Sequence, residues 1–298
     1  MIFGIHKKKK MELSGRIYED VKFLTEIRPY RNYKNIDTLN KVVDYIKNEF
    51  EKIGLDVEEQ PFIANNNTYK NIIGSYNSTA SKRLIVGAHY DVDGDQEGAD
   101  DNASAVAGLL ELARLVAENK PKLDYRIDFV AFNLEEMPFY TTNEMGSYVH
   151  AKSLKDNDID VIGMICLEMI GYFSDEPHSQ IYPFPYLYEI YPSIGNFIIV
   201  VGREEQLQFN SKIFKLMKKD SKIDVQKLNV YMDDPLAQLA VLSDHRNYWS
   251  FGYDAVMIND TSFIRNPNYH KKSDTIDTLD FDKITKVVDC LYNAVIGL

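Results

Sequence analysis

Seven short β-like runs recur along the chain, and several of them are unbroken apolar stretches rather than alternating patterns. Such stretches are typical of strands that are covered on both faces. The runs are residues 55–63, 69–76, 83–89, 126–133, 161–169, 196–202 and 253–260. Helical patterns lie between them, most clearly in 36–53 and from Val106 to Ala117. Strands that alternate with helices predict an α/β fold, here a three-layer α/β/α sandwich around a mixed, mostly parallel central sheet.

The chain of 298 residues shows no internal repeat and no low-complexity linker, so we expect a single domain. Residues 1–15 are expected to form a flexible tail. Residues 172–195 are rich in Tyr, Phe and Pro, and their four prolines argue against a regular helix. We expect a long aromatic loop near the functional site, because loops of that size often form its walls or lids.

Composition argues against some classes of partner. The formal net charge of -11 disfavours binding to nucleic acid or to an anionic membrane, because both are bound by clustered Lys and Arg. No window approaches the roughly 18 consecutive apolar residues that span a bilayer. The two cysteines, Cys166 and Cys290, are far apart, so no disulfide framework is indicated. No apolar signal segment follows MIFGIHKKKK, and we therefore predict a cytoplasmic protein.

Four of the runs lead into side chains that are able to bind a metal ion, either at the end of the run or shortly after it. They are, in chain order, His89, Glu135, Glu136, Glu168 and His270. In an open α/β sheet the ligand crevice lies outside the carboxyl ends of the strands, so these side chains are expected to meet. The adjacent Glu135 and Glu136 follow a run that should be buried. A buried carboxylate pair needs a cation or protons nearby, because uncompensated buried charge is costly.

An acid-rich stretch, GAHYDVDGDQEGADDNASA, joins the third run to the helix that follows it. Asp101 lies just before this helix, where the positive end of the helix dipole helps to keep a carboxylate ionised. The intervening Asp93, Asp95 and Glu97 are interpreted as a solvated loop that crosses the rim of the site. The stretch therefore adds acidic residues to the same edge of the sheet.

Several motifs occur in the order found in a known family. They are GAHYD, then GADDNAS leading into LLELARLV, then NLEE, then GS at Gly146, then LEMIGY, SDH and YHKKSDT. With these motifs the chain, from about Leu24 to its end, resembles the zinc metallopeptidase family of bacterial leucyl aminopeptidases, glutamate carboxypeptidases and glutaminyl cyclases. Three features depart from the family's pattern. Glu168 stands where many members have Asp, and Ala105 replaces a glycine in NASA. The segment after Glu136 is longer than in the compact aminopeptidases.

The resemblance implies a site with two Zn²⁺ ions per chain. Its implied metal ligands are His89 and Glu168 on the first metal, Glu136 and His270 on the second, and Asp101 between the two. Asp100 is the less favoured bridge. Asp91 resembles the acid that orients the first histidine. Glu135 resembles the general base, and Tyr269 stands where some relatives have a tyrosine that hydrogen-bonds the oxyanion. Imidazole and carboxylate ligands suit zinc, and manganese or cobalt would also fit them.

Such a site implies an exopeptidase. The first hypothesis is an aminopeptidase that hydrolyses the N-terminal residue of a peptide or small amide through a metal-bridging hydroxide, with Glu135 as the base. One alternative is a glutaminyl-cyclase-like acyltransferase with a single zinc. Another is a carboxypeptidase or dipeptidase, in which Arg265 or Arg246 anchors a substrate carboxylate. A non-catalytic, metal-stabilised binding module is the last alternative, and the presence of Glu135 beside the five ligands argues against it.

The tripeptide Ser243, Asp244 and His245 resembles part of a serine-hydrolase triad. No GxSxG elbow is present, however, and contiguous residues do not easily form a triad. In the family that the chain resembles, this segment supports the site without binding metal. We therefore predict that it shapes the pocket.

Overall fold

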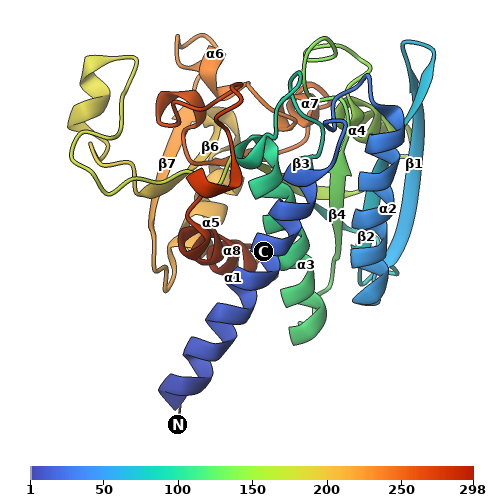
Figure 1. Ribbon diagram of the computed structural model, residues 1–298, viewed down its shortest axis with the longest axis horizontal. Helices are drawn as coiled ribbons and strands as arrows, with labels where there is room; N and C mark the ends of the chain where they lie inside the picture. The colour runs from blue at the N-terminus through green and yellow to red at the C-terminus, as the bar shows by residue number, and fades with distance from the viewer. Residues whose placement is uncertain (1) are drawn as a thin grey trace.

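An eight-stranded sheet forms the centre of the molecule in the computed structural model, which describes residues 2–298, with side chains from residue 13 onward (Figure 1). The strands are β1 (Asp56–Ala64), β2 (Asn67–Tyr76), β3 (Arg83–His89), β4 (Arg126–Phe132), β5 (Val161–Glu168), β6 (Phe197–Arg203), β7 (Asp224–Val230) and β8 (Ala255–Asn259). Their order is β1-β2-β4-β3-β5-β8-β6-β7. The central strands β4, β3, β5 and β8 are parallel, as are β6 and β7, and the remaining pairs are antiparallel. The predicted mixed, mostly parallel sheet is confirmed.

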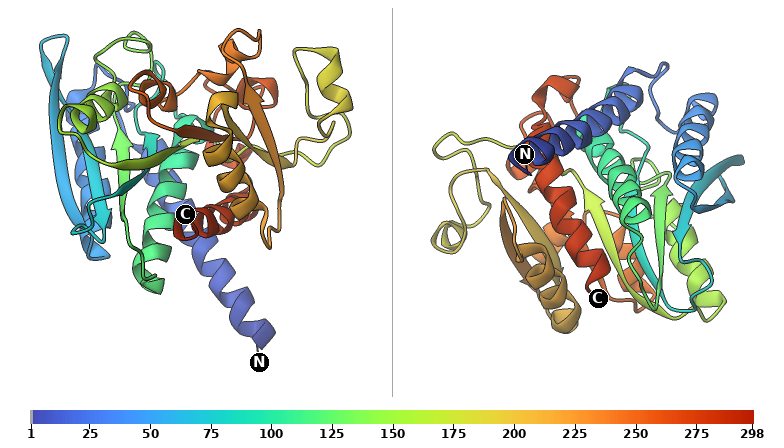
Figure 2. Two further views of the ribbon diagram at one scale, coloured as in Figure 1. Left: turned by 180° about the vertical axis from the view of Figure 1, so that it is seen from behind. Right: turned by 90° about the horizontal axis from the view of Figure 1, so that it is seen from below.

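Helices cover both faces of this sheet and complete three layers (Figure 2). One face carries α1 (Ile2–Glu26), α2 (Ile36–Lys52), α3 (Ala105–Asn119), α5 (Leu207–Lys218) and α8 (Phe281–Ile296). The other face carries α4 (Gly146–Asp156), α6 (Ala237–Ala240) and α7 (His245–Ser250). Short helices lie in the connections, namely η1 (Ala99–Ser104), η2 (Pro185–Glu189), η3 (Glu204–Gln206), η4 (Ser262–Ile264) and η5 (Ile276–Thr278). The predicted α/β/α sandwich is confirmed.

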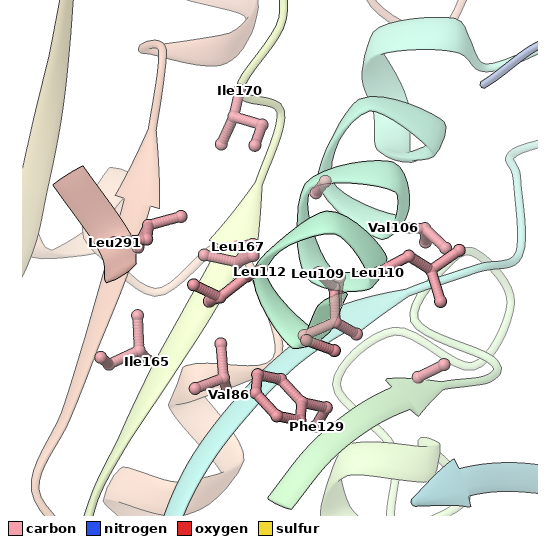
Figure 3. Packing of buried hydrophobic residues seen from close by; sticks show 14 of the residues in the cluster. Val86, Val106, Leu109, Leu110, Leu112, Phe129, Ile165, Leu167, Ile170 and Leu291 are labelled. Atoms are coloured by element: carbon pink, nitrogen blue, oxygen red, sulfur yellow. The ribbon is translucent and has the colours of Figure 1, made fainter. Parts of the chain in front are cut away.

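The larger core lies between the sheet and α3 (Figure 3). Leu109 and Leu112 of α3 pack with strand residues Val86, Phe129 and Ile165, and all five are fully buried. The alternate residues of the same strands belong to a second core under α4 and α7. Because burying each of these side chains contributes about 1.5–3 kcal/mol, the two cores fix the strands and therefore the positions of the strand ends.

The N-terminal segment differs from the expectation. The helix α1 replaces the flexible tail expected for residues 1–15, and Met1 lies outside the described residues. Leu13, Ile17 and Val21 recur at the spacing of a helix face and are buried. This face packs against α3 and α8, and that burial accounts for a helix where we expected a tail.

The edge strand β7 is absent from the runs that the apolar pattern indicated. It pairs with β6 at the end of the sheet, and its middle residues Gln226, Lys227 and Asn229 are partly exposed. An edge strand is covered less completely than a central one, so its sequence carries no unbroken apolar run.

Residues 172–195 form the expected long loop, interrupted by the short helix η2, and this loop stands out from the body of the fold (Figures 1 and 2). Among the described residues, no helix is both long and apolar enough to cross a membrane.

Candidate metal centre

The carboxyl ends of the parallel strands meet at one edge of the sheet, as their polarity requires. His89 is the last residue of β3, and Glu168 is the last residue of β5. Glu135 and Glu136 follow β4 closely, and His270 lies in the loop after β8. The structure therefore brings the five side chains expected from the strand ends to the same place.

Asp101 lies between the two histidines. Its Oδ1 is 3.4 Å from Nε2 of His89, and its Oδ2 is 3.0 Å from Nε2 of His270. Each oxygen of one carboxylate thus faces a different imidazole. This is the arrangement that a carboxylate shared by two metal ions requires.

Two further carboxylates complete a ligand set on each side of Asp101. Oε2 of Glu168 lies 3.4 Å from Nε2 of His89, and Oε2 of Glu136 lies 3.4 Å from Nε2 of His270. One ligand atom from each of His89, Asp101 and Glu168 lies within 4.8 Å of the other two. The side chains therefore form two adjacent sets that share one carboxylate.

The unsatisfied atoms of these sets fit a zinc site. Nε2 of His89 and Nε2 of His270 are buried and have no hydrogen-bond partner, although carboxylate oxygens lie around both. Imidazole nitrogens and carboxylate oxygens are ligands that Zn²⁺ takes. Divalent ions would bind both nitrogens and offset the buried negative charge.

Asp91 ties the end of β3 to the turn that follows β4. Its two oxygens accept the backbone N–H groups of Glu135 and Glu136, both at 3.1 Å. Its Oδ1 also lies 3.4 Å from Nδ1 of His89, on the side of the ring that faces away from Asp101. One buried carboxylate therefore holds the backbone that carries two glutamates, and it lies beside Nδ1 of the first histidine, where a carboxylate that orients a metal-binding imidazole is expected.

Asp274 has a role that the sequence reasoning missed. Its carboxylate accepts the backbone N–H of Asp100 at 2.9 Å and that of Asp101 at 3.1 Å. Gly98, just upstream, has a φ of 57°, and a Cβ there would lie 2.3 Å from the carbonyl oxygen of Asp101. These features hold the backbone that presents Asp101. The available signal was the motif YHKKSDT, whose aspartate is Asp274.

Asp100 points away from the histidines. Its Oδ1 accepts the N–H of Gly171 at 2.9 Å, and its Oδ2 accepts from Nδ2 of Asn266 at 2.7 Å. Both oxygens of Asp100 therefore have hydrogen-bond partners away from the histidines. This agrees with the expectation that Asp101 is the better candidate for a carboxylate that bridges two metal ions.

Burial dominates the electrostatics of the site. It raises the pKa of Glu135 well above its usual value, and neighbouring carboxylates add to this effect. Burial and the nearby Asp101 raise the pKa of Glu136 to about 8. Burial lowers the pKa of His270, but Asp101 and Glu136 outweigh this and raise the pKa to about 11. The cluster therefore attracts protons, and the same field attracts divalent cations, which displace them.

The segment Ser243, Asp244 and His245 does not form a triad. The Ser243 hydroxyl donates to Oε2 of Glu168 at 2.5 Å, and Nε2 of His245 donates to the carbonyl oxygen of Ala240 at 2.6 Å. Asp244 is fully buried, and burial raises its pKa to about 7. The serine-hydrolase arrangement is therefore absent, and Ser243 supports a predicted metal ligand.

A cavity of about 270 Å³ opens beside the carboxylates. Its acidic end is formed by Asp101, Glu135, Glu136 and Glu168. Tyr269 also lines the cavity and stacks on the ring of His270, with centroids 3.8 Å apart and an interplanar angle of 18°. Apolar side chains from three strands, the segment around α6 and the aromatic loop form much of the remaining wall, including Tyr182, Leu187, Ile199, Val201, Leu228, Leu236, Leu239 and Met257. Polar residues, namely Gln180, Asn259, Thr261 and Ser262, line it as well.

The two arginines considered as carboxylate anchors lie elsewhere. Arg265 donates to Oε1 of Gln180 at 2.8 Å and to the carbonyl oxygen of Phe197 at 2.9 Å, so it fastens the aromatic loop to β6. The guanidinium of Arg246 lies over the ring of Tyr140, 5.2 Å from its centroid. Neither arginine lines the cavity.

The three acids interpreted as a solvated loop behave differently from one another. Oδ1 of Asp95 accepts from Nδ2 of Asn32 at 3.1 Å, and Glu97 pairs with Arg28 at 3.0 Å. Oδ2 of Asp93 instead lies 3.7 Å from Nδ1 of His270, although the Asp93 side chain is partly exposed. This proximity to the loop after β8 is one that sequence spacing does not encode.

Comparisons with known proteins agree with this geometry. The family model described as "Peptidase family M28" matches residues 71–295. The uncharacterized protein YfbL of Escherichia coli (strain K12) is 41% identical over 293 residues, which cover 94% of this chain and 88% of that protein. The Legionella pneumophila LapA aminopeptidase aligns with a TM-score of 0.74 at 19% identity, over 98% of this chain and 74% of that one. A Bacteroides thetaiotaomicron glutaminyl cyclase aligns with a TM-score of 0.69 at 20% identity, over 96% of this chain and 98% of that one.

The matched region contains every predicted site residue. It confirms the resemblance to a metallopeptidase family that the motifs indicated, and with it the predicted hydrolase class. The two solved structures share the fold, and they differ from each other in activity as their names state.

Proposed function

The chain belongs to peptidase family M28, and from that premise we propose that it is a two-zinc aminopeptidase that removes residues with large apolar side chains from the N-termini of peptides. The observation that carries this proposal is the lining of the cavity, in which the four carboxylates of the candidate metal centre occur together with many apolar side chains.

Five side chains would hold the metals. His89, Asp101 and Glu168 would hold one Zn²⁺ ion, and Asp101, Glu136 and His270 would hold the other. Two such ions supply Lewis-acid polarisation of the scissile carbonyl and lower the pKa of the attacking water. Glu135 lines the cavity and is placed to take the proton of that water and pass it to the leaving amine.

The cavity offers no cationic side chain that could anchor a substrate carboxylate. Four carboxylates line it, and among the described residues no Lys or Arg does. The proposed zinc ions would offset the charge of these carboxylates, and a C-terminal carboxylate would find no arginine or lysine on the wall. The absence of an anchoring arginine therefore supports aminopeptidase over carboxypeptidase activity.

The apolar wall favours a large apolar side chain on the first residue. Ile199 and Val201 of β6, Leu228 of β7 and Met257 of β8 line the cavity. A leucine or phenylalanine side chain gains free energy when it leaves water for such a surface, about 1.5–3 kcal/mol when fully buried. A charged side chain would find no partner on this apolar surface.

Tyr269 is proposed to donate its phenolic hydrogen to the oxyanion that develops on the substrate carbonyl. Its place on the cavity wall, stacked on His270, supports this role. Burial and nearby carboxylates raise its pKa, so the hydroxyl keeps the hydrogen that it would donate.

A substrate panel tests the proposal. Zinc-loaded protein should hydrolyse leucine and phenylalanine anilides, and blocking the amine by N-acetylation should abolish the reaction because the proposed activity acts on residues with a free N-terminal amine. Release of C-terminal residues from N-acetylated peptides would instead indicate a carboxypeptidase. Ammonia release from peptides with N-terminal glutamine would indicate a cyclase, and no turnover with full zinc occupancy would indicate a binding module.

A further inference from the structure

We propose that Asp93 is a positioning residue that orients His270 and thereby sets the affinity of the second zinc ion. This inference rests on the proposed two-zinc function. It gives a role to one acid of the stretch between β3 and α3 that the sequence had suggested was only solvated.

The geometry of His270 carries the proposal. Nε2 of its ring faces the site, at 3.0 Å from Oδ2 of Asp101 and 3.4 Å from Oε2 of Glu136. Nδ1, on the opposite side of the ring, lies 3.7 Å from Oδ2 of Asp93. This separation is longer than a hydrogen bond. The proposal is that the two side chains form the hydrogen bond when zinc is bound to Nε2.

The contact repeats a pattern already present on the other side of the site. Asp91 faces Nδ1 of His89 in the same way, at 3.4 Å. Both acids come from the segment HYDVD, in which they occupy alternate positions. A single segment thus supplies a carboxylate behind each histidine.

His270 needs such a partner more than His89 does. His89 ends a buried strand and is 1% exposed, whereas the side chain of His270 lies on a loop and is 28% exposed. Packing alone therefore restrains His270 less. A carboxylate that accepts the Nδ1 hydrogen fixes the tautomer with Nε2 free for a metal, and it makes that nitrogen more basic.

The matched variants are Asp93→Asn and Asp95→Asn. Both remove one negative charge from the same loop, but Asp95 faces Asn32 rather than a histidine. Zinc binding to metal-free protein is measured by competition with a chelator of known affinity, which resolves the two binding steps. Asp93→Asn should weaken one step roughly 10–100-fold and leave the other unchanged. Asp95→Asn should change both by less than about twofold.

A second readout reports the contact itself. In zinc-loaded protein labelled with ¹⁵N-histidine, the Nδ1–H resonance of His270 should show a strong hydrogen bond that Asp93→Asn weakens and Asp95→Asn leaves unchanged. Asp93→Glu should recover part of the lost affinity, because it restores a carboxylate.

The outcomes separate the two proposals. Wild type with two zinc ions and an Asp93→Asn variant that binds them like Asp95→Asn would overturn the positioning role and leave the proposed function intact. Equal weakening of both steps by Asp93→Asn would also overturn it, since the role assigned is specific to one site. A wild type that saturates with one zinc would overturn the two-zinc function, and the role of Asp93 with it.

Discussion

Glu135 and Glu136 are adjacent and both nearly buried, yet they face different partners. Oε2 of Glu136 lies 3.4 Å from Nε2 of His270, whereas Oε2 of Glu135 lies 3.9 Å from Nε2 of His89. The backbone N–H groups of both donate to Asp91, which fixes the backbone from which the two side chains extend. This difference supports the proposal that Glu136 binds a metal ion and Glu135 transfers the proton.

Substitution of the proposed base should separate chemistry from metal binding. Glu135→Gln keeps the shape of the side chain but removes its ability to accept a proton, so kcat should fall at least about a hundredfold while the zinc content stays unchanged. Glu136→Gln is the matched control and should lose zinc. Steady-state kinetics with metal analysis measures both, and wild-type kcat in Glu135→Gln would show that the base lies elsewhere.

The protonation of His150 in α4 should make the free energy of unfolding depend on pH. Burial lowers its pKa from 6.5 to about 4, and its Nδ1 lies 2.6 Å from the hydroxyl of Tyr248. Above pH 6.5 the ring is neutral in both states. As the pH falls from 6.5 towards 4, His150 becomes protonated in the unfolded chain but stays neutral in the folded chain. The folded state therefore loses roughly 3 kcal/mol over this window.

Urea unfolding of wild type and His150→Gln over that pH window measures how the free energy of unfolding depends on pH in each protein. The variant is expected to be less stable near neutral pH but to lose less stability on acidification, because glutamine does not titrate. Parallel stability curves for the two proteins would mean that His150 is not a buried neutral histidine.

At this scale the sequence predicted which side chains meet but not all of their supports. His89, Glu168 and the two glutamates follow from strand ends, because apolar runs and strand polarity determine where these ends lie. The roles of Asp274 and Asp93 could not be predicted in the same way. Each acts on a residue brought near by loop packing, which leaves no periodic signal in the sequence.

At the scale of elements, the helix α1 was not predicted, because its apolar helical pattern directly follows a run of lysines. The lysine run near the N-terminus suggested a solvated tail, although Leu13, Ile17 and Val21 repeat at helical spacing immediately after it. The sheet was predicted more completely, because central strands carry unbroken apolar runs. The edge strand β7 was missed because it is covered by fewer neighbours.

Substitutions on the two faces of α1 test its packing. Ile17 is fully buried, so Ile17→Ala should lower the free energy of unfolding by about 2–5 kcal/mol. Glu19 is exposed, and Glu19→Ala should change it by less than about 0.5 kcal/mol. Chemical denaturation measures both, and equal stability of the two variants would contradict the packing of α1 on α3 and α8.

At the scale of the whole molecule, the candidate metal centre lies where two regions meet. The histidines and carboxylates come from the carboxyl ends of the parallel strands, while the apolar cavity wall comes from β6, β7, α6 and the aromatic loop. The loop is fixed to the sheet by Arg265. The family motifs predicted the first region well. The second could not be read in advance, because a cavity wall is defined by elements that meet only in the folded chain.

The central claim is a two-zinc aminopeptidase, and a zinc titration of metal-free protein tests it most directly. Hydrolysis of a leucine anilide is followed as zinc is added in known ratio to the chain. Because the two proposed ligand sets share Asp101, we expect activity to rise until two zinc ions are bound per chain and then to stay constant. A plateau at one zinc per chain, or no hydrolysis at full occupancy, would contradict the account.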